Sequence, residues 1–184
     1  YSEIKLTHVA DTGLTLKHTA TADDKPIILT LQTGETDIAA DDVIGTINFQ
    51  APDEAQGTDA ILVAAGIEAV SEGDFSSSNN ATKLSFKTGA SEAAAEKVAI
   101  SSAGNLSLTA SNTELRFYEG SNYVGFEAPA LSADQIWVLP SADGSSGQQL
   151  QTDGSGNLSW AAGSSADPSS ADGDSLGTSS AEWS

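Results

Sequence analysis

The sequence has neither cysteine nor methionine among its 184 residues. The lack of cysteine excludes disulfides, thiolate metal sites and thiol catalysis. Because small secreted domains often depend on disulfides, this chain must obtain its stability from another source. The chain also begins at Tyr1 instead of a methionine, so we expect it to be a piece of a longer product or a processed one.

Basic residues are scarce as well. The chain has 7 Lys and Arg against 26 Asp and Glu, which gives a formal net charge of -19. Such a surface repels nucleic acids, whose phosphates are bound by Lys and Arg, and it repels anionic membrane leaflets for the same reason. No run approaches the roughly 18 apolar residues of a membrane span, and no signal-peptide pattern is present. We therefore predict neither a nucleic-acid partner nor membrane insertion.

What the sequence does contain is an alternation of apolar and polar residues with a period of two, which is typical of short half-buried strands. Gly, Pro, Asn or Asp bound these segments at close intervals, as all-β folds require. The pattern therefore predicts an all-β fold. Its apolar positions are Ile4 and Leu6, Leu14 and Leu16, Ile27, Leu29 and Leu31, Ile47 and Phe49, Leu84 and Phe86, Val98 and Ile100, Leu106 and Leu108, Leu115 and Phe117, Val124 and Phe126, and Ile136 and Val138.

Helix signals are weak. Residues 91–99 contain good helix formers behind a serine cap, but a segment of this length is too short to be a stable helix alone, so we interpret it as one turn or a loop. Residues 59–70 are ambiguous, and their β-branched side chains together with Gly66 favour strands over a helix.

Two segments share a Gly-Asn-Leu-Ser core, at residues 101–109 (SSAGNLSLT) and 153–161 (DGSGNLSWA). Gly and Asn tolerate positive φ angles, so each core predicts a tight turn that leads into a strand. A looser echo opens three strands that end in Phe49, Phe86 and Phe117. Echoes at irregular spacing indicate modules arranged in series.

No group of residues predicts a metal, cofactor or catalytic site. His8 and His18 lack a third ligand at metal-site spacing, and we interpret them as polar residues of strands. The acidic turns around Asp23, Asp41 and Asp172 fit neither the EF-hand loop nor the calcium-binding repeat, so solvated turns are the default interpretation and cation binding is the alternative. Paired carboxylates without a defined spacing give no signal for glycan hydrolysis.

The predicted strands carry only two or three inward residues each. At about 25 cal/mol per Å² of buried apolar area, so thin a core barely offsets the loss of chain entropy. Unpaired strand edges add a second problem, because they invite association. Three copies around one axis would merge three thin faces into one core and pair the edges between chains. We therefore predict a homotrimer, with a monomeric sandwich as the alternative.

Residues 137–161, WVLPSADGSSGQQLQTDGSGNLSWA, resemble a module of bacteriophage tail-fibre and related virion appendage proteins. The shared pattern is a strand ending in Leu-Pro, an Ala-Asp-Gly turn, a Gly-Gln-x-Leu strand, a Thr-Asp-Gly turn and Gly-Asn-Leu-Ser-Trp. Residues 41–70, 81–109 and 113–140 are also similar to fibre segments, and residues 4–19 are similar to the fibres of marine and cyanobacterial phages. The likeness thus covers most of the chain.

The resemblance implies a homotrimeric, β-rich, elongated fibre that is attached to the virion at one end and contacts the host surface at the other. We predict four segments: a β module at 1–50, a β module with room for a short helix at 51–110, the fibre module at 111–161, and a Gly/Ser/Asp-rich linker at 162–184 that leads to a further module. The predicted function is a structural shaft that supports host attachment, without catalysis and without a cofactor.

The predicted partners are two identical chains, other virion proteins, and a glycan or protein of the host surface. The alternation around the two tryptophans of the fibre module favours packing over stacking on sugars. The alternative functions are a polysaccharide-degrading tailspike domain and a calcium-dependent cell-surface adhesin. The residues expected to pack the trimer are Phe49, Phe86, Phe117, Phe126, Trp137 and Trp160.

Overall fold

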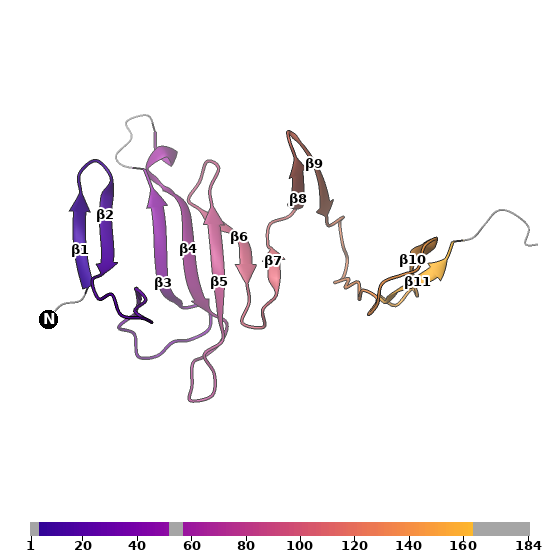
Figure 1. Cartoon of the computed structure of the whole chain (residues 1–184), viewed down its shortest axis with the longest axis horizontal. Helices are drawn as coiled ribbons and strands as arrows, with labels where there is room; N and C mark the ends of the chain where they lie inside the picture. Colours follow the sequence, from indigo (N-terminus) through magenta and orange to yellow (C-terminus); the bar gives the residue numbers. More distant parts are fainter. Residues whose placement is uncertain (1–3, 52–56, 164–184) are drawn as a thin grey trace, which may run out of the picture. The chain divides into compact units, whose positions relative to one another are not determined.

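A computed structural model of the chain describes residues 4–51 and 57–163 (Figure 1). These residues form β-strands and one 3₁₀ helix, η1 (Asp59–Ile61), and contain no α-helix. The all-β class predicted from the alternating pattern is therefore confirmed. The chain divides into two compact units, Tyr1–Pro129 and Ala130–Ser184. Within the described ranges no helix is long and apolar enough to cross a membrane.

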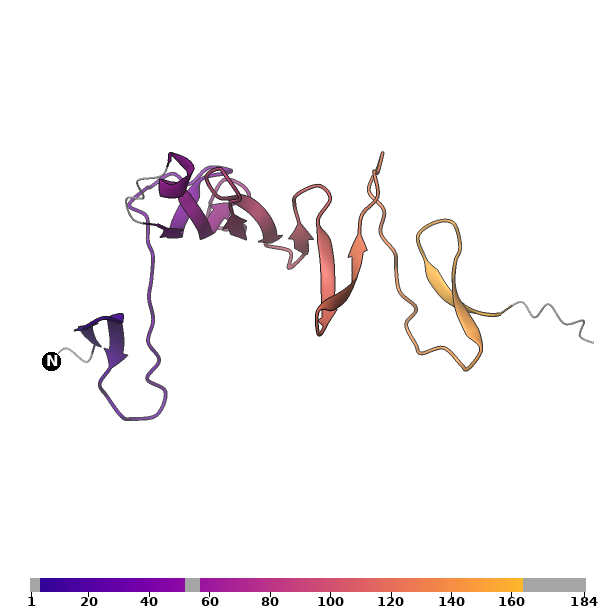
Figure 2. The ribbon, with the colours of Figure 1, turned by 90° about the horizontal axis from the view of Figure 1, so that it is seen from above.

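The first unit contains three antiparallel sheets: a hairpin of β1 and β2, a five-stranded sheet in the order β3-β4-β5-β6-β7, and a hairpin of β8 and β9 (Figure 1). Each strand therefore pairs with its neighbour in the sequence. An irregular segment joins β2 to β3 (Figure 2). The strands are β1 (Ile4–Val9), β2 (Gly13–His18), β3 (Val43–Gln50), β4 (Val63–Ser71), β5 (Thr82–Thr88), β6 (Ala95–Ile100), β7 (Leu106–Leu108), β8 (Glu114–Glu119) and β9 (Asn122–Glu127).

The second unit contains one antiparallel hairpin, formed by β10 (Gln148–Thr152) and β11 (Leu158–Ala162). An isolated parallel bridge joins Val138 to Asn157 at the turn of this hairpin. The predicted linker at 162–184 lies outside the described residues from position 164 onward.

Two of the predicted strands are wrong. Residues 27–31 alternate in the sequence but form no strand, because no neighbouring strand offers them a ladder. Leu31 instead lies over Gly45, where a Cβ atom would be only 3.2 Å from the Leu31 Cβ. Residues 136–138 also form no strand, since only Val138 makes a bridge.

Residues 91–99 and 59–70, whose secondary structure the sequence left uncertain, each contain an irregular or 3₁₀ part followed by a strand. Residues 91–94 are a loop, and the remainder of the segment 91–99 belongs to β6, so the interpretation as a turn or loop holds only for its first half. Of residues 59–70, the first three form η1 and the last eight belong to β4, in agreement with the preference for a strand.

Very little apolar surface is buried within one chain. Among the described residues the buried apolar side chains are Val70, Ala94 and Ala99, and the large apolar side chains that alternate along the strands are mostly exposed. The prediction of half-buried strands holds for β4 and β5, most of whose residues are partly or fully buried, and is wrong for most of the other strands of a single chain. Backbone hydrogen bonds between neighbouring strands, rather than a hydrophobic core, define the fold.

Candidate functional site

The five-stranded sheet has one apolar face. Residues directly opposite each other in a ladder share a face, and a single row of such pairs crosses all five strands. Both ends of this row are exposed, at 44% for Ile47 and 41% for Leu108. The row consists of Ile47, Ile67, Phe86, Val98 and Leu108.

A second apolar row lies two residues along the strands on the same face. It consists of Ala69, Leu84, Ile100 and Leu106. Phe49, opposite Ala65, extends the face toward the other end of β3. Because these side chains project to one side and most are exposed, the sheet presents a continuous apolar surface that nothing in the described chain covers completely.

The opposite face of this sheet is mostly polar, and the two apolar side chains Val70 and Ala99 on it are buried within the chain. Glu68 accepts hydrogen bonds from Lys87 Nζ at 3.2 and 3.3 Å and from Thr46 Oγ1 at 3.3 Å. Lys83 lies 3.0 Å from Glu96. Burial raises the pKa of the Glu96 carboxyl, but hydrogen bonds from Lys83 and Ser85 outweigh it and leave the pKa below its ordinary value. The Glu68 and Glu96 carboxylates of this face are thus paired with lysines of the same chain.

The β8–β9 hairpin repeats the same division. One face carries Leu115 opposite Phe126 and Phe117 opposite Val124, and all four side chains are exposed. The Phe117 and Phe126 rings meet edge to face with centroids 6.5 Å apart. A two-stranded hairpin is marginally stable in water unless its apolar face is packed, so this face also lacks a cover in one chain.

The other face of the β8–β9 hairpin is polar and aromatic. Arg116 Nε donates to Glu114 at 2.7 Å, and its guanidinium carbon lies 4.4 Å from the centre of the Tyr123 ring. The hydrogen bond from Arg116 lowers the pKa of the Glu114 carboxyl. Tyr118 contacts Tyr123 with ring centroids 5.4 Å apart. All of these contacts join residues of the same hairpin.

The β1–β2 hairpin places both histidines on its more apolar face. His8 lies opposite Leu14 and His18 opposite Ile4, with the pair Leu6 and Leu16 between them. Both histidines are strand residues, as predicted, and His8 shares a face with Ile4 and Leu6 and is exposed. His18 Nδ1 accepts a hydrogen bond from the Ala20 backbone at 3.1 Å.

The Gly-Asn-Leu-Ser echo corresponds to one turn that occurs twice. Between β6 and β7 the Ser101 backbone N–H donates to the Asn105 carbonyl at 3.0 Å, and the Ser101 hydroxyl accepts from the Asn105 N–H at 3.1 Å. Between β10 and β11 the Asp153 N–H donates to the Asn157 carbonyl at 3.1 Å, and the Asp153 carboxylate accepts from the Asn157 N–H at 3.1 Å. The predicted tight turns are therefore confirmed.

The aspartate turn carries additional hydrogen bonds. Asp153 also accepts from Asn157 Nδ2 and from the Ser155 N–H, both at 2.7 Å. These bonds, that from Asn157 first, lower the pKa of the Asp153 carboxyl. Gly156, whose φ is +94°, lets the chain pass the Ile136 carbonyl, which would lie 2.8 Å from a Cβ at this position. The turn is thus held in one shape by a single carboxylate.

Trp160 anchors the preceding loop of the second unit. Its Nε1 donates to the Ala142 carbonyl at 2.8 Å, and its ring lies so close to Gly144 that a Cβ there would be 2.6 Å away. The Ala-Asp-Gly and Gly-Asn-Leu-Ser-Trp elements of the sequence pattern therefore meet in space. Together they form one compact module on the β10–β11 hairpin.

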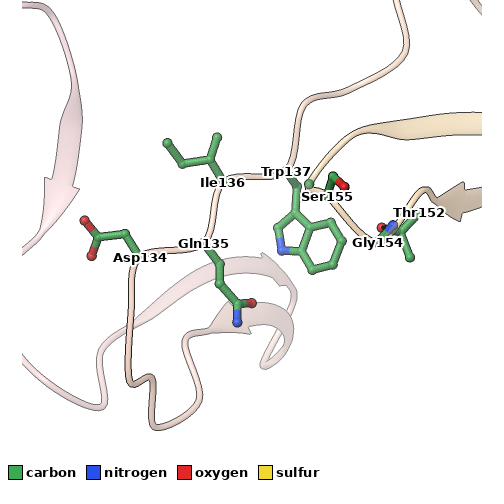
Figure 3. Close-up of a pocket in the computed structure, with 8 residues that line it drawn as sticks. Asp134, Gln135, Ile136, Trp137, Thr152, Gly154 and Ser155 are labelled. Atoms are coloured by element: carbon green, nitrogen blue, oxygen red, sulfur yellow. Dashed lines mark hydrogen bonds between the residues drawn. The ribbon is translucent and has the colours of Figure 1, made fainter.

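A cleft of about 390 Å³ opens beside Trp137 in the second unit. Gln135 and Trp137 project to one side of their segment and Ile136 to the other, and the indole lies between the Gln135 side chain and the turn that carries Thr152 and Ser155 (Figure 3). Trp137 is 55% exposed. Its alternating pattern had favoured packing.

Aspartate carboxylates in the turns accept hydrogen bonds from backbone N–H groups. Asp42 accepts from the Ala39 N–H at 2.6 Å, and Asp74 from the Ala40 N–H at 3.2 Å. Across residues 4–51 and 57–163, no three His, Asp or Glu side chains come together in a way that could hold a metal ion. Asp172 lies outside the described residues.

The residues predicted to pack the trimer fall into three groups. Phe49 and Phe86 share the apolar face of the five-stranded sheet, and Phe117 contacts Phe126 on the β8–β9 hairpin. The other two, Trp137 and Trp160, belong to the second unit. The aliphatic rows between the phenylalanines were not among the predicted packing residues. The alternation had marked most of these positions, but Ile67 lay in the ambiguous segment and gave no clear signal.

The chain matches no protein-family model, no curated protein and no solved structure.

Proposed function

We propose that this chain is a structural shaft subunit of a bacteriophage virion fibre, assembled as a homotrimer that supports attachment to the host surface. The proposal rests on one observation above all: the five-stranded sheet has a mostly polar face and an uncovered apolar face. The fibre module resembles segments of homotrimeric phage fibres, and in a homotrimer such a face would be covered by the other two chains.

A second and third copy of the chain are suitable covers. Contiguous apolar patches larger than a few hundred Å² are rare on soluble monomers and mark interaction sites. Three sheets can turn their apolar rows toward a common axis and keep their ion-paired faces in water, which is a closed symmetric arrangement. The net charge of -19 then lies on the outside and keeps the fibre soluble.

The proposed role is mechanical. Every sheet of the first unit divides in the same way, so apolar contacts between copies repeat along the chain. Separating one copy would expose all of these contacts at once. Such an assembly resists dissociation without containing a thick core in any one chain.

Sedimentation velocity and equilibrium on the full chain test the proposal. We expect a mass of three times 18.7 kDa, about 56 kDa, and a frictional ratio well above that of a globular protein. A compact monomer of 18.7 kDa would overturn it, and a stable dimer would overturn its trimeric form. Antibodies against the chain are expected to label virion appendages in electron micrographs, and labelling of host cells alone would contradict the virion location.

A further inference from the structure

We propose that the cleft beside Trp137 binds a neutral sugar residue of a polysaccharide. This inference rests on the proposed function in one respect only, namely that the polysaccharide belongs to a host cell surface. The binding site itself lies within the second unit of a single chain, so it can be tested whatever the oligomeric state.

The Trp137 indole is 55% exposed and makes no hydrogen bond within the described part of the chain. Trp160 in the same unit differs, because its Nε1 donates to the Ala142 carbonyl. Tryptophan has an apolar ring and one polar atom and is favoured where a partner is apolar on one side and wet on the other. A pyranose ring, with an apolar C–H face and a rim of hydroxyls, is such a partner.

Polar groups surround the indole. The Asp134 carboxylate and the Gln135 amide border the cleft and make no hydrogen bond within the described part of the chain. The hydroxyls of Thr152 and Ser155 lie on the far side of the indole (Figure 3). A carboxylate, an amide and hydroxyls together accept and donate hydrogen bonds, as vicinal sugar hydroxyls require.

The size and charge of the cleft define the ligand further. Its volume of about 390 Å³ is within the range of about 300–1,000 Å³ found for small-molecule sites. No Lys or Arg lines the cleft, Asp134 contributes a negative charge, and the whole chain carries -19. These charges disfavour uronic acids, sialic acids and phosphates. The ligand is therefore a neutral sugar.

The Ile136 side chain points in a different direction from the Trp137 indole (Figure 3). Ile136 lines the cleft as well, but its side chain points away from Gln135 and Trp137 (Figure 3) and is highly exposed. Ile136 can therefore pack against another copy while the indole remains open to solvent. In this arrangement Trp137 has a ligand-binding role in place of the packing role that its sequence pattern favoured.

The test uses the full chain labelled with 5-fluorotryptophan, so that each of the 3 tryptophans gives its own ¹⁹F resonance. Maltohexaose, cellohexaose and α-mannohexaose are the neutral probes, and hexagalacturonate is the anionic one. We expect at least one neutral probe to shift the Trp137 resonance alone, and hexagalacturonate to leave it unchanged. If no neutral probe shifts this resonance at millimolar concentration, or if only the anionic probe does, the proposal is wrong.

Two variants and one solvent measurement complete the test. Trp137→Ala should weaken binding about tenfold or more, as the loss of a stacked aromatic contact predicts. Leu139→Ser, which changes an exposed apolar side chain of the same segment that does not line the cleft, should bind as the unchanged chain does. The H₂O/D₂O isotope shift of the Trp137 resonance should show full exposure before sugar is added, and a shielded indole would mean that another copy fills the cleft. Sedimentation of the same sample reports separately on the trimer.

Discussion

Replacement of Phe126 by alanine tests whether the apolar faces are covered in the assembly. Phe126 is 72% exposed in the single chain and lies opposite Leu115 on the apolar face of the β8–β9 hairpin. A fully covered phenylalanine buries about 150–250 Å², so covering the exposed part would remove about 110–180 Å² from water. At about 25 cal/mol per Å² this corresponds to about 2.7–4.5 kcal/mol per chain and about 8–14 kcal/mol per trimer.

The assay is equilibrium unfolding in guanidinium chloride, followed by far-UV circular dichroism at several protein concentrations, because the stability of an oligomer depends on concentration. Tyr118→Ala is the matched control, since Tyr118 is an aromatic residue of the same hairpin, 63% exposed, on the opposite face. It should cost no more than the loss of its contact with Tyr123, about 0.5–1.5 kcal/mol. If Phe126→Ala changes the free energy of unfolding by less than about 0.5 kcal/mol per chain, as a surface substitution does, the apolar face is not covered and the reasoning fails.

Three further predictions concern other parts of the chain. Ile47→Asp places a charge in the apolar row and should abolish the trimer in sedimentation, whereas Asn48→Asp on the opposite face should leave it intact; equal effects would contradict the assignment of faces. Asp153 has a lowered pKa in the folded chain, so its contribution is present above the unfolded value of about 3.9 and is lost as the pH falls through the folded value. Asp153→Ser, which copies the Ser101 turn, should therefore keep the hairpin but flatten the acid limb of the stability-pH curve, and an unchanged limb would refute this role. Gly144→Ala should displace the Trp160 ring, destabilise the second unit by about 1–3 kcal/mol and red-shift the tryptophan fluorescence. Gly34→Ala is the control and should have none of these effects, because a Cβ at Gly34 would have no atom within 4 Å.

The local structure was the part that the sequence could predict. The two Gly-Asn-Leu-Ser turns have nearly the same hydrogen bonds, because the residue before each turn, Ser101 or Asp153, has a side-chain oxygen that accepts from the asparagine N–H. Alternation located the strands for the same local reason. It failed at residues 27–31, where the pattern is present but no strand lies beside it, since a strand requires a partner that the pattern does not specify.

The candidate site was predicted less completely. Aromatic side chains were the obvious packing residues, yet the continuous feature of the sheet is a row in which Phe86 is flanked by Ile67 and Val98. That row exists only in the observed register, and the bulge between Phe86 and Lys87 changes which residues follow it on each face. Register depends on turn geometry and on what each face contacts. A single sequence shows the turns but not the contacts.

Polar and apolar groups of this chain differ in how far the single chain satisfies them. Strands pair with their sequence neighbours, and within residues 4–51 and 57–163 no buried side-chain nitrogen or oxygen lacks a hydrogen-bond partner. Polar groups are thus satisfied locally. Apolar groups are not, since Ile47 and Leu108 at the two ends of one row are both exposed. Hydrogen bonding is directional and short in range, so neighbouring strands can complete it, whereas hydrophobic burial requires a second surface of matching size. The chain thus completes its hydrogen bonds and leaves apolar faces of its sheets uncovered, which is the observation behind the proposed trimer.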